Sequence, residues 1–224
     1  FITDILSVFG VSSPVVGRLG TIDYTAAAKG HDGKYVLTGD FATGVGTLQH
    51  KLSYADKLIT TDISTTKDLR LGYLLNTKVL GDVKAKIYAD AAITKDSKTG
   101  KTALRTIDAK VDIPYIVANG YEYRNIKLDS KVQDDMAELF LGIADMNANG
   151  NITLVASNFS SLFKGQAREL RNIGITADIT HLNPYALGIL KADTISHTPL
   201  SFTVQAAADK IGYGGNGLYH IPDP

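Results

Sequence analysis

The stretch IVANGYEYRNIKLDSKV, residues 116–132, indicates the fold class of this chain. Asn119 and Gly120 form a strong hairpin signal, because both residue types accept a positive φ. After this turn apolar side chains alternate with polar ones, and the parity slips once near Arg124 and Asn125, as a β-bulge would cause. The stretch therefore predicts a β-hairpin whose second strand has one apolar face.

The same alternation continues along most of the chain, for example in TIDYTAAAKG (21–30) and DVKAKIYADAAI (82–93). Together these runs predict an all-β antiparallel meander of about a dozen strands joined by short turns. Helical spacing is confined to three short segments, residues 2–9, 67–75 and 182–190. In the last of these, Asn183 is the expected cap and Pro184 the first helical residue.

The polar stretch TKDSKTGKTA, residues 94–103, divides a front part (1–93) from a back part (104–224). Strand patterns occur on both sides, so this stretch is expected to be a hairpin tip or a covering loop within one β-rich segment, 1–224. The chain begins at Phe1 and ends at HIPDP. It is interpreted as an internal piece of a longer protein, in which any targeting segment lies elsewhere.

Composition excludes several classes of function. The chain has 23 basic and 23 acidic residues, so its net charge of +0 argues against nucleic acid as the main partner. Cysteine is absent, which excludes disulfides and thiolate chemistry. No apolar run approaches the length of a membrane-spanning helix, and no signal peptide is visible.

The segments that resemble chemical motifs each lack an essential residue. Residues 145–151, DMNANGN, begin like a calcium loop, but Ala156 stands where Glu is needed and a strand pattern follows. Residues 100–102 end like a phosphate-binding loop, but Lys95 replaces its first glycine. The five histidines are far apart, and a glycan-acting enzyme would usually use tryptophan, which is absent. We therefore predict no catalytic residue, no metal site, no cofactor and no enzymatic activity.

The alternating apolar face could pack against a second sheet in a closed β-sandwich, or it could line an open groove. That face is rich in alanine, whereas a compact sandwich usually fills its core with large aliphatic side chains. An alanine-rich face could instead line a groove. On these arguments a closed β-sandwich, acting as a structural or adhesive module, and an open grooved sheet both remain.

Four segments in sequence order resemble the TamB-like proteins of the AsmA superfamily, particularly the long Bacteroidetes members. The resemblance extends over residues 17–195, and the tail after residue 198 matches nothing in the family pattern. Asn147 and Asn149 also depart from a segment that is often more apolar in that family. The four segments are GRLGTIDYTAAAKGHDGKYVLTGDFATGVGTL (17–48), DLRLGYLLNTKVLGDVKAKIYADA (68–91), NGYEYRNIKLDSKVQDDMAELFLGIADMNANGNITLVASNF (119–159) and ITADITHLNPYALGI (175–189).

The resemblance implies an open curved half-pipe, the β-taco, with a few short helices and an apolar groove. TamB-like proteins are large periplasmic proteins that are anchored at the inner membrane and work with an Omp85-type outer-membrane protein. They have been assigned to outer-membrane protein assembly and to phospholipid transport between the two membranes, and they have no known active-site chemistry. This chain would then be an internal section of such a half-pipe, binding phospholipid acyl chains or unfolded outer-membrane protein strands.

Within such a half-pipe, every second side chain of successive strands would line the groove. Four alanines on three of these strands, Ala85, Ala89, Ala109 and Ala177, would keep the channel wide. The predicted groove-lining residues are Ala85, Ile87, Ala89, Ala109, Val111, Ile113, Tyr121, Tyr123, Ile126, Leu128, Ile175 and Ala177.

Overall fold

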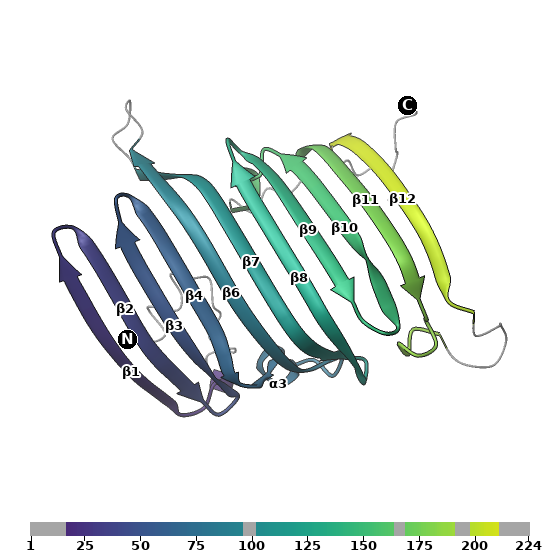
Figure 1. Ribbon diagram of the computed structural model, residues 1–224, viewed down its shortest axis with the longest axis horizontal. Helices are drawn as coiled ribbons and strands as arrows, with labels where there is room; N and C mark the ends of the chain where they lie inside the picture. Colours follow the sequence, from purple (N-terminus) through teal and green to yellow (C-terminus); the bar gives the residue numbers. More distant parts are fainter. Residues whose placement is uncertain (1–16, 96–101, 164–168, 191–197, 211–224) are drawn as a thin grey trace.

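The computed structural model describes residues 17–95, 102–163, 169–190 and 198–210. In these residues the chain forms one antiparallel sheet of twelve strands that does not close on itself (Figure 1). The prediction of an open, curved all-β meander with very few helices is thereby confirmed. The alternative of a closed sandwich is wrong for the described residues, because they form one sheet and not two facing layers.

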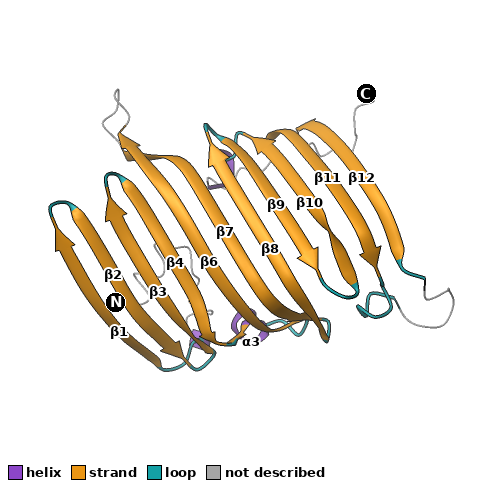
Figure 2. Ribbon diagram, viewed as in Figure 1, coloured by secondary structure: helices purple, strands orange, loops and turns teal. Residues whose placement is uncertain are grey.

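Strands that are neighbours in the chain are neighbours in the sheet, with one exception. The two-residue β5 pairs with β6 on the same edge of β6 that pairs with β4. Figure 2 shows how few helices accompany the strands. The strands are β1 (Ile22–His31), β2 (Lys34–Thr43), β3 (Gly46–Ala55), β4 (Leu58–Lys67), β5 (Leu69–Arg70), β6 (Leu80–Lys95), β7 (Thr102–Ala118), β8 (Tyr121–Gln133), β9 (Met136–Ala144), β10 (Ala148–Ser157), β11 (Arg171–Leu182) and β12 (Leu200–Lys210). The helices are α3 (Leu71–Leu75) and α4 (Ser160–Phe163).

Two-residue turns explain this simple topology. The predicted hairpin at Asn119 and Gly120 is confirmed, with φ values of 51° and 77°. Two consecutive positive φ values are typical of the type I′ turn, whose twist matches that of the strands it joins. The same pattern occurs at three further hairpins, Asp32–Gly33, Asp56–Lys57 and Asp134–Asp135.

The predicted parity slip lies at Asn125, which has a φ of 53°. The pairing register between β7 and β8 does not shift there: Ile113 pairs with Ile126 and Tyr115 with Arg124, so Pro114 falls opposite Asn125. Proline has no N–H to donate to the ladder, so this position can leave the ladder without losing a bond. The register shift appears one strand away, between β6 and β7.

The polar stretch between the front and back parts does not separate two sheets. β6 and β7 pair with each other as far as Lys95 and Thr102, so only residues 96–101 lie outside the described part of this hairpin. One sheet therefore contains both parts of the chain.

The three helix predictions have different outcomes. Residues 2–9 lie outside the described residues. The prediction for 67–75 is confirmed in its last turn, α3, which β5 precedes. Residues 183–190 form a hydrogen-bonded turn and not a regular helix. Asn183 caps this turn, since its Oδ1 accepts a hydrogen bond from the Ala186 N–H at 3.1 Å, and the φ of 69° at Gly188 ends it.

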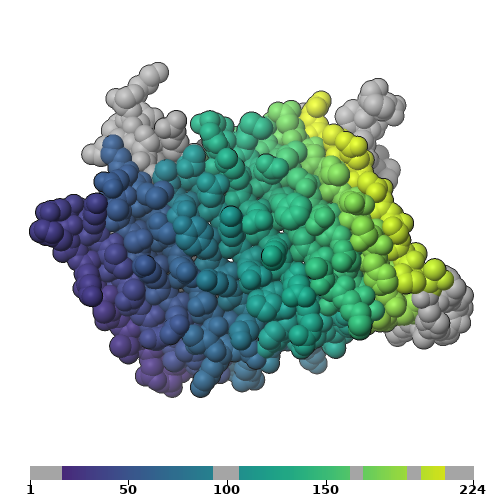
Figure 3. Space-filling view, viewed as in Figure 1, coloured from purple at the N-terminus to yellow at the C-terminus, as the bar shows by residue number. Residues whose placement is uncertain are grey.

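Buried apolar side chains are concentrated at one end of the strands, the lower end in Figure 1. Val45 is in the β2–β3 turn, Val83 is near the start of β6, Ala148 starts β10, and Leu187 is in the turn after β11. The core is therefore a narrow band beneath these turns. Above it the sheet is a single layer in the described residues, and the colours of Figure 3 follow the sequence across the surface.

Candidate functional site: the apolar face of the sheet

The cross-strand register joins the apolar positions of separate strands into one surface, here called the apolar face. Residues that lie directly opposite each other in a sheet project from the same side. A central row therefore crosses eleven strands with no break and contains one ionisable residue, His50. Its members, from β1 to β12, are Ala26, Gly39, His50, Ile63, Ile87, Val111, Leu128, Leu141, Ile152, Ala177 and Val204.

The apolar face is only partly covered. Most members of the central row are half-buried, Ala177 is buried, and Val204 on the last strand is 44% exposed. Each described strand packs against the strands beside it, and no described second sheet lies over this surface. Large apolar patches of this kind commonly mark binding surfaces on soluble proteins.

Ten of the twelve predicted groove-lining residues lie together on the apolar face. Ile87, Val111 and Leu128 are directly opposite one another in the central row, and Ile113 is opposite Ile126 in a neighbouring row. The predicted alanines also lie on this face: Ala89 and Ala109 are paired, Ala177 is central, and Ala85 exchanges two hydrogen bonds with the Thr65 hydroxyl. Ile175 completes the group opposite Leu154.

Small side chains form a second row beside the central one. Thr61, Ala89, Ala109 and Ser130 stand opposite one another across β4, β6, β7 and β8. All four are half-buried. The side chains along this row are therefore shorter than the isoleucine, valine and leucine side chains of the central row beside it, as expected if the alanines widen a groove.

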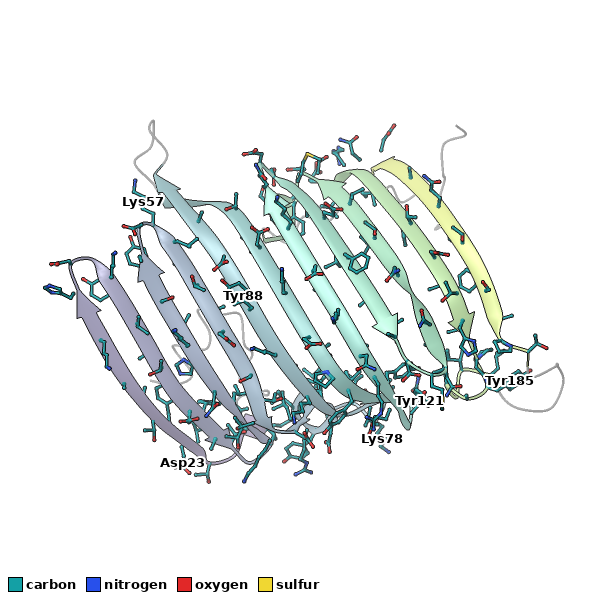
Figure 4. The ribbon with its side chains drawn as sticks, viewed as in Figure 1. Asp23, Lys57, Lys78, Tyr88, Tyr121 and Tyr185 are labelled. Atoms are coloured by element: carbon teal, nitrogen blue, oxygen red, sulfur yellow. The ribbon has the colours of Figure 1, made fainter. Side chains whose placement is uncertain are left out.

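Tyr121 lies at the lower rim of the sheet (Figure 4), and Tyr123 is two residues further along the same strand, near the β7–β8 hairpin. Their rings contact each other edge to face, with centroids 4.8 Å apart. The Tyr121 hydroxyl donates a hydrogen bond of 2.5 Å to the buried carboxylate of Asp145, which also accepts bonds from the N–H groups of Arg124 and Asn147. This network makes Tyr121 a rim residue whose hydroxyl is engaged with protein and does not face an open groove.

The same network raises the pKa of both rim tyrosines. For Tyr121 the larger cause is burial, followed by the hydrogen bond to Asp145. For Tyr123 the causes are burial and then the charge of Asp145. Asp145 was considered above as a first calcium ligand, and the structure places it in the short turn between β9 and β10, where its carboxylate is buried. Its oxygens are used by neighbouring donors.

Sequence reasoning did not nominate the aromatic group at the front of the apolar face. The Tyr24 hydroxyl shares a hydrogen bond of 2.9 Å with His50 Nε2, and the two rings stack. Gly39 on β2 separates His50 from Ala26 of β1 in the central row, and a Cβ at Gly39 would lie 2.9 Å from the His50 Nε2. Tyr35 and Tyr54 also stack, and they are 58% and 37% exposed. The sequence signal that could have identified this aromatic group was the alternation of its tyrosines with polar residues.

The opposite side of the sheet, here called the polar face, carries charges of alternating sign. Lys86, Asp112 and Lys127 stand opposite one another on β6, β7 and β8. Opposite charges across strands stabilise a sheet modestly. On this face a shallow hollow of about 490 Å³ is lined by residues that include Tyr88 and Phe140. The hydrogen bond from Tyr88 to Asp90, followed by burial, raises the pKa of Tyr88.

The described residues contain neither a candidate metal site nor a helix suited to crossing a membrane. No group of three or more His, Cys, Asp or Glu side chains that could hold a metal ion occurs among them. None of the helices in these ranges is long and apolar enough to cross a membrane.

Comparisons with known proteins identify no relative: no protein-family model, no curated protein and no solved structure matches this chain. The apolar face is therefore the feature of the molecule from which a function is inferred.

Proposed function

We propose that the apolar face binds phospholipid acyl chains. We further propose that the chain is a section of a periplasmic envelope-biogenesis protein of the TamB-like type, anchored at the inner membrane, which conducts lipid between the inner and outer membranes without enzymatic chemistry. The observation that carries this proposal is the unbroken central row on a sheet that remains open.

The dimensions of the apolar face suit a hydrocarbon chain. Eleven strands lie side by side on the main path of the sheet, and at about 4.8 Å per strand the row extends about 48 Å. The residues along it from Ile63 to Ile152 are all branched aliphatic side chains, which offer hydrocarbon contacts and no hydrogen bonds. A surface of this kind has no preference for the position of an acyl chain along the row, which suits movement.

The energy available is sufficient for binding. Transfer of one CH₂ group from water to an apolar surface releases about 0.8 kcal/mol. Since the apolar face is open on one side, a bound chain would bury part of its surface. Contact along eight methylene groups at about half this value would contribute about 3 kcal/mol. Two acyl chains of one phospholipid would roughly double that contribution.

The charges on the polar face complement this arrangement. Lysine and aspartate rows keep that side in water, so a lipid tail has one favourable side of the sheet to contact. Consecutive positions on one strand therefore provide matched controls. Ile87 is on the apolar face, and Lys86 and Tyr88 are on the polar face.

The test is photocrosslinking in a bacterial host with a benzophenone amino acid placed at one position at a time. Ile87, Val111 and Leu128 are the test positions, and their polar-face neighbours Lys86, Lys110 and Lys127 are the matched controls. We expect phospholipid adducts, identified by mass spectrometry, at the first set and not at the second.

Two results would contradict the proposal. Equal labelling of both sets would show that the sheet associates with lipid without using the apolar face. Crosslinks to unfolded outer-membrane proteins in place of lipid would assign the apolar face to amphipathic strands. Extraction of the purified chain gives an independent measurement, in which bound phospholipid is expected at near-stoichiometric amounts.

A further inference from the structure

The edge strand β1 has features of a pairing surface that are separate from lipid binding. It ends the sheet order, and nine of its ten residues are exposed. Natural edge strands are usually protected by proline, by bulges or by inward charges, because an unpaired edge recruits another strand. β1 contains no proline, and its pairing with β2 is regular over all ten residues.

The hairpin that joins β1 to β2 determines which backbone groups face outward. His31 and Lys34 flank a two-residue turn and therefore form a hydrogen-bonded pair. In an antiparallel ladder such pairs alternate with non-hydrogen-bonded pairs, so the odd-numbered residues of β1 bond to β2. The even-numbered residues direct their N–H and C=O groups to the open edge: Ile22, Tyr24, Ala26, Ala28 and Gly30.

This pattern permits one favoured antiparallel pairing of β1 with a second β1. The outward-facing residues must pair with one another, and the apolar side chains must stay on one side of the joint sheet. A two-fold axis at Ala26 meets both conditions and uses residues 22–30 of each strand. Ala26 then lies opposite its own copy, and Tyr24 lies opposite Ala28 of the other chain.

Charge supports this register. On the polar face the same pairing places Asp23 opposite Lys29 of the second copy, twice by symmetry. Both residues are exposed and fall in non-hydrogen-bonded pairs, where side chains are closest. On the apolar face the large Tyr24 and Ile22 meet the small Ala28 and Gly30, so side-chain volumes are complementary as well.

We propose that β1 is a self-association edge through which two copies of this chain form a two-fold dimer with one continuous sheet and one continuous apolar face. The apolar faces of the two copies then lie on the same side of the joint sheet. Its two outer edges are the β12 strands of the two copies. This dimer is proposed for the 224-residue chain, in which no described strand pairs with the outer edge of β1. It does not depend on what the apolar face binds, so it can fail while the lipid proposal stands.

The other edge offers weaker support for pairing. A two-fold pairing of β12 about Val204 also matches large with small side chains, but its central residues 200–208 carry no charge. Pairing of β1 with β12 would be parallel, since eleven alternating strands leave both edges running in the same direction. Parallel pairing is slightly less stable per residue.

Cysteine crosslinking of the 224-residue chain distinguishes these arrangements, because the chain has no cysteine of its own. Directly opposite residues in a hydrogen-bonded pair are about 5.5 Å apart at Cα, within disulfide range. Mild oxidation of Ala26→Cys should give a covalent dimer, whereas Val204→Cys should stay monomeric. A dimer only with Val204→Cys, or only in a mixture of the two variants, overturns the proposal.

A charge exchange tests the register in solution. Sedimentation equilibrium should give a dissociation constant about tenfold higher for Asp23→Lys and for Lys29→Asp, because each variant converts two attractive pairs into two repulsive ones. The double exchange should restore the wild-type value. Lys57→Asp, in the turn between β3 and β4 and away from β1, is the matched control and should change nothing. Two results would overturn the proposal. One is a wild-type chain that is monomeric at all concentrations. The other is a double exchange that fails to restore association although circular dichroism shows that the chain is folded.

Discussion

Gly72→Ala tests the packing of α3 against the sheet. Gly72 is buried in α3, where the chain turns back into β6. A Cβ at this position would lie 1.8 Å from the Leu80 carbonyl oxygen. That atom belongs to the backbone and cannot rotate away. The Gly72 carbonyl also accepts a hydrogen bond of 2.9 Å from Thr77, which fixes the helix end from the other side.

Two effects of opposite sign decide the outcome. Alanine is favoured over glycine within a helix by about 1 kcal/mol. Relief of the clash requires the Cβ–oxygen separation to increase from 1.8 Å to at least 3.0 Å, which displaces either α3 or the start of β6. Overpacking of this kind costs about 1–3 kcal/mol, and more where backbone must move. The backbone contact places the cost at the upper end of that range, so after the gain in helix propensity is subtracted the expected net loss is about 2 kcal/mol in the free energy of unfolding.

Urea unfolding followed by circular dichroism measures this loss, with Gly17→Ala as control. Gly17 is exposed and has no neighbouring atom within 4 Å of an added Cβ, so its variant should match or slightly exceed wild-type stability. A Gly72→Ala variant as stable as the control would refute this prediction, because the higher helix propensity of alanine would then outweigh the close approach of α3 to Leu80.

Three further predictions concern single side chains. Tyr121→Phe should cost about 2 kcal/mol in urea unfolding, because the buried Asp145 loses a donor; an unchanged midpoint would contradict the rim network. A hydrogen bond with Asp68, then burial and nearby carboxylates, raises the pKa of Tyr115 to about 12, so its stabilisation is complete below pH 10 and lost as pH rises towards 12. Tyr115→Phe should flatten that decline in stability, and an unchanged slope would refute the assignment. Ile87→Asp should weaken binding of a fluorescent fatty acid about fourfold, by removing contact with about two methylene groups at about half of their transfer free energy; Lys86→Asp is the control.

Local sequence signals were sufficient for the strands and their turns. Alternation of side chains identified the strands, and Asn119–Gly120 identified a hairpin because the I′ turn needs two residues that accept positive φ. Alternation also grouped Ile87, Val111 and Leu128 on one face, since register in a meander of short turns follows from turn length.

The features that sequence reasoning missed depend on pairs of residues far apart in the chain. The slip at Asn125 falls opposite Pro114, and the pairing register stays intact there. Asp145 and Tyr121 are 24 positions apart and meet through a rim that no single segment defines. The helix expected at 182–190 is only a hydrogen-bonded turn, which ends at Gly188 with its positive φ. Contacts of this kind are set by tertiary arrangement and have no local signature.

Because every described strand rests chiefly on its two neighbours in a single layer, stability should behave as a linear array. In a single, undimerised copy each internal strand is held from two sides, whereas β1 and β12 are held from one. Amide hydrogens at the margins should exchange with solvent first, and protection should rise towards β7 and β8. Fraying at a margin then leaves the middle of the molecule intact, so the chain can lose or gain a hairpin without global collapse.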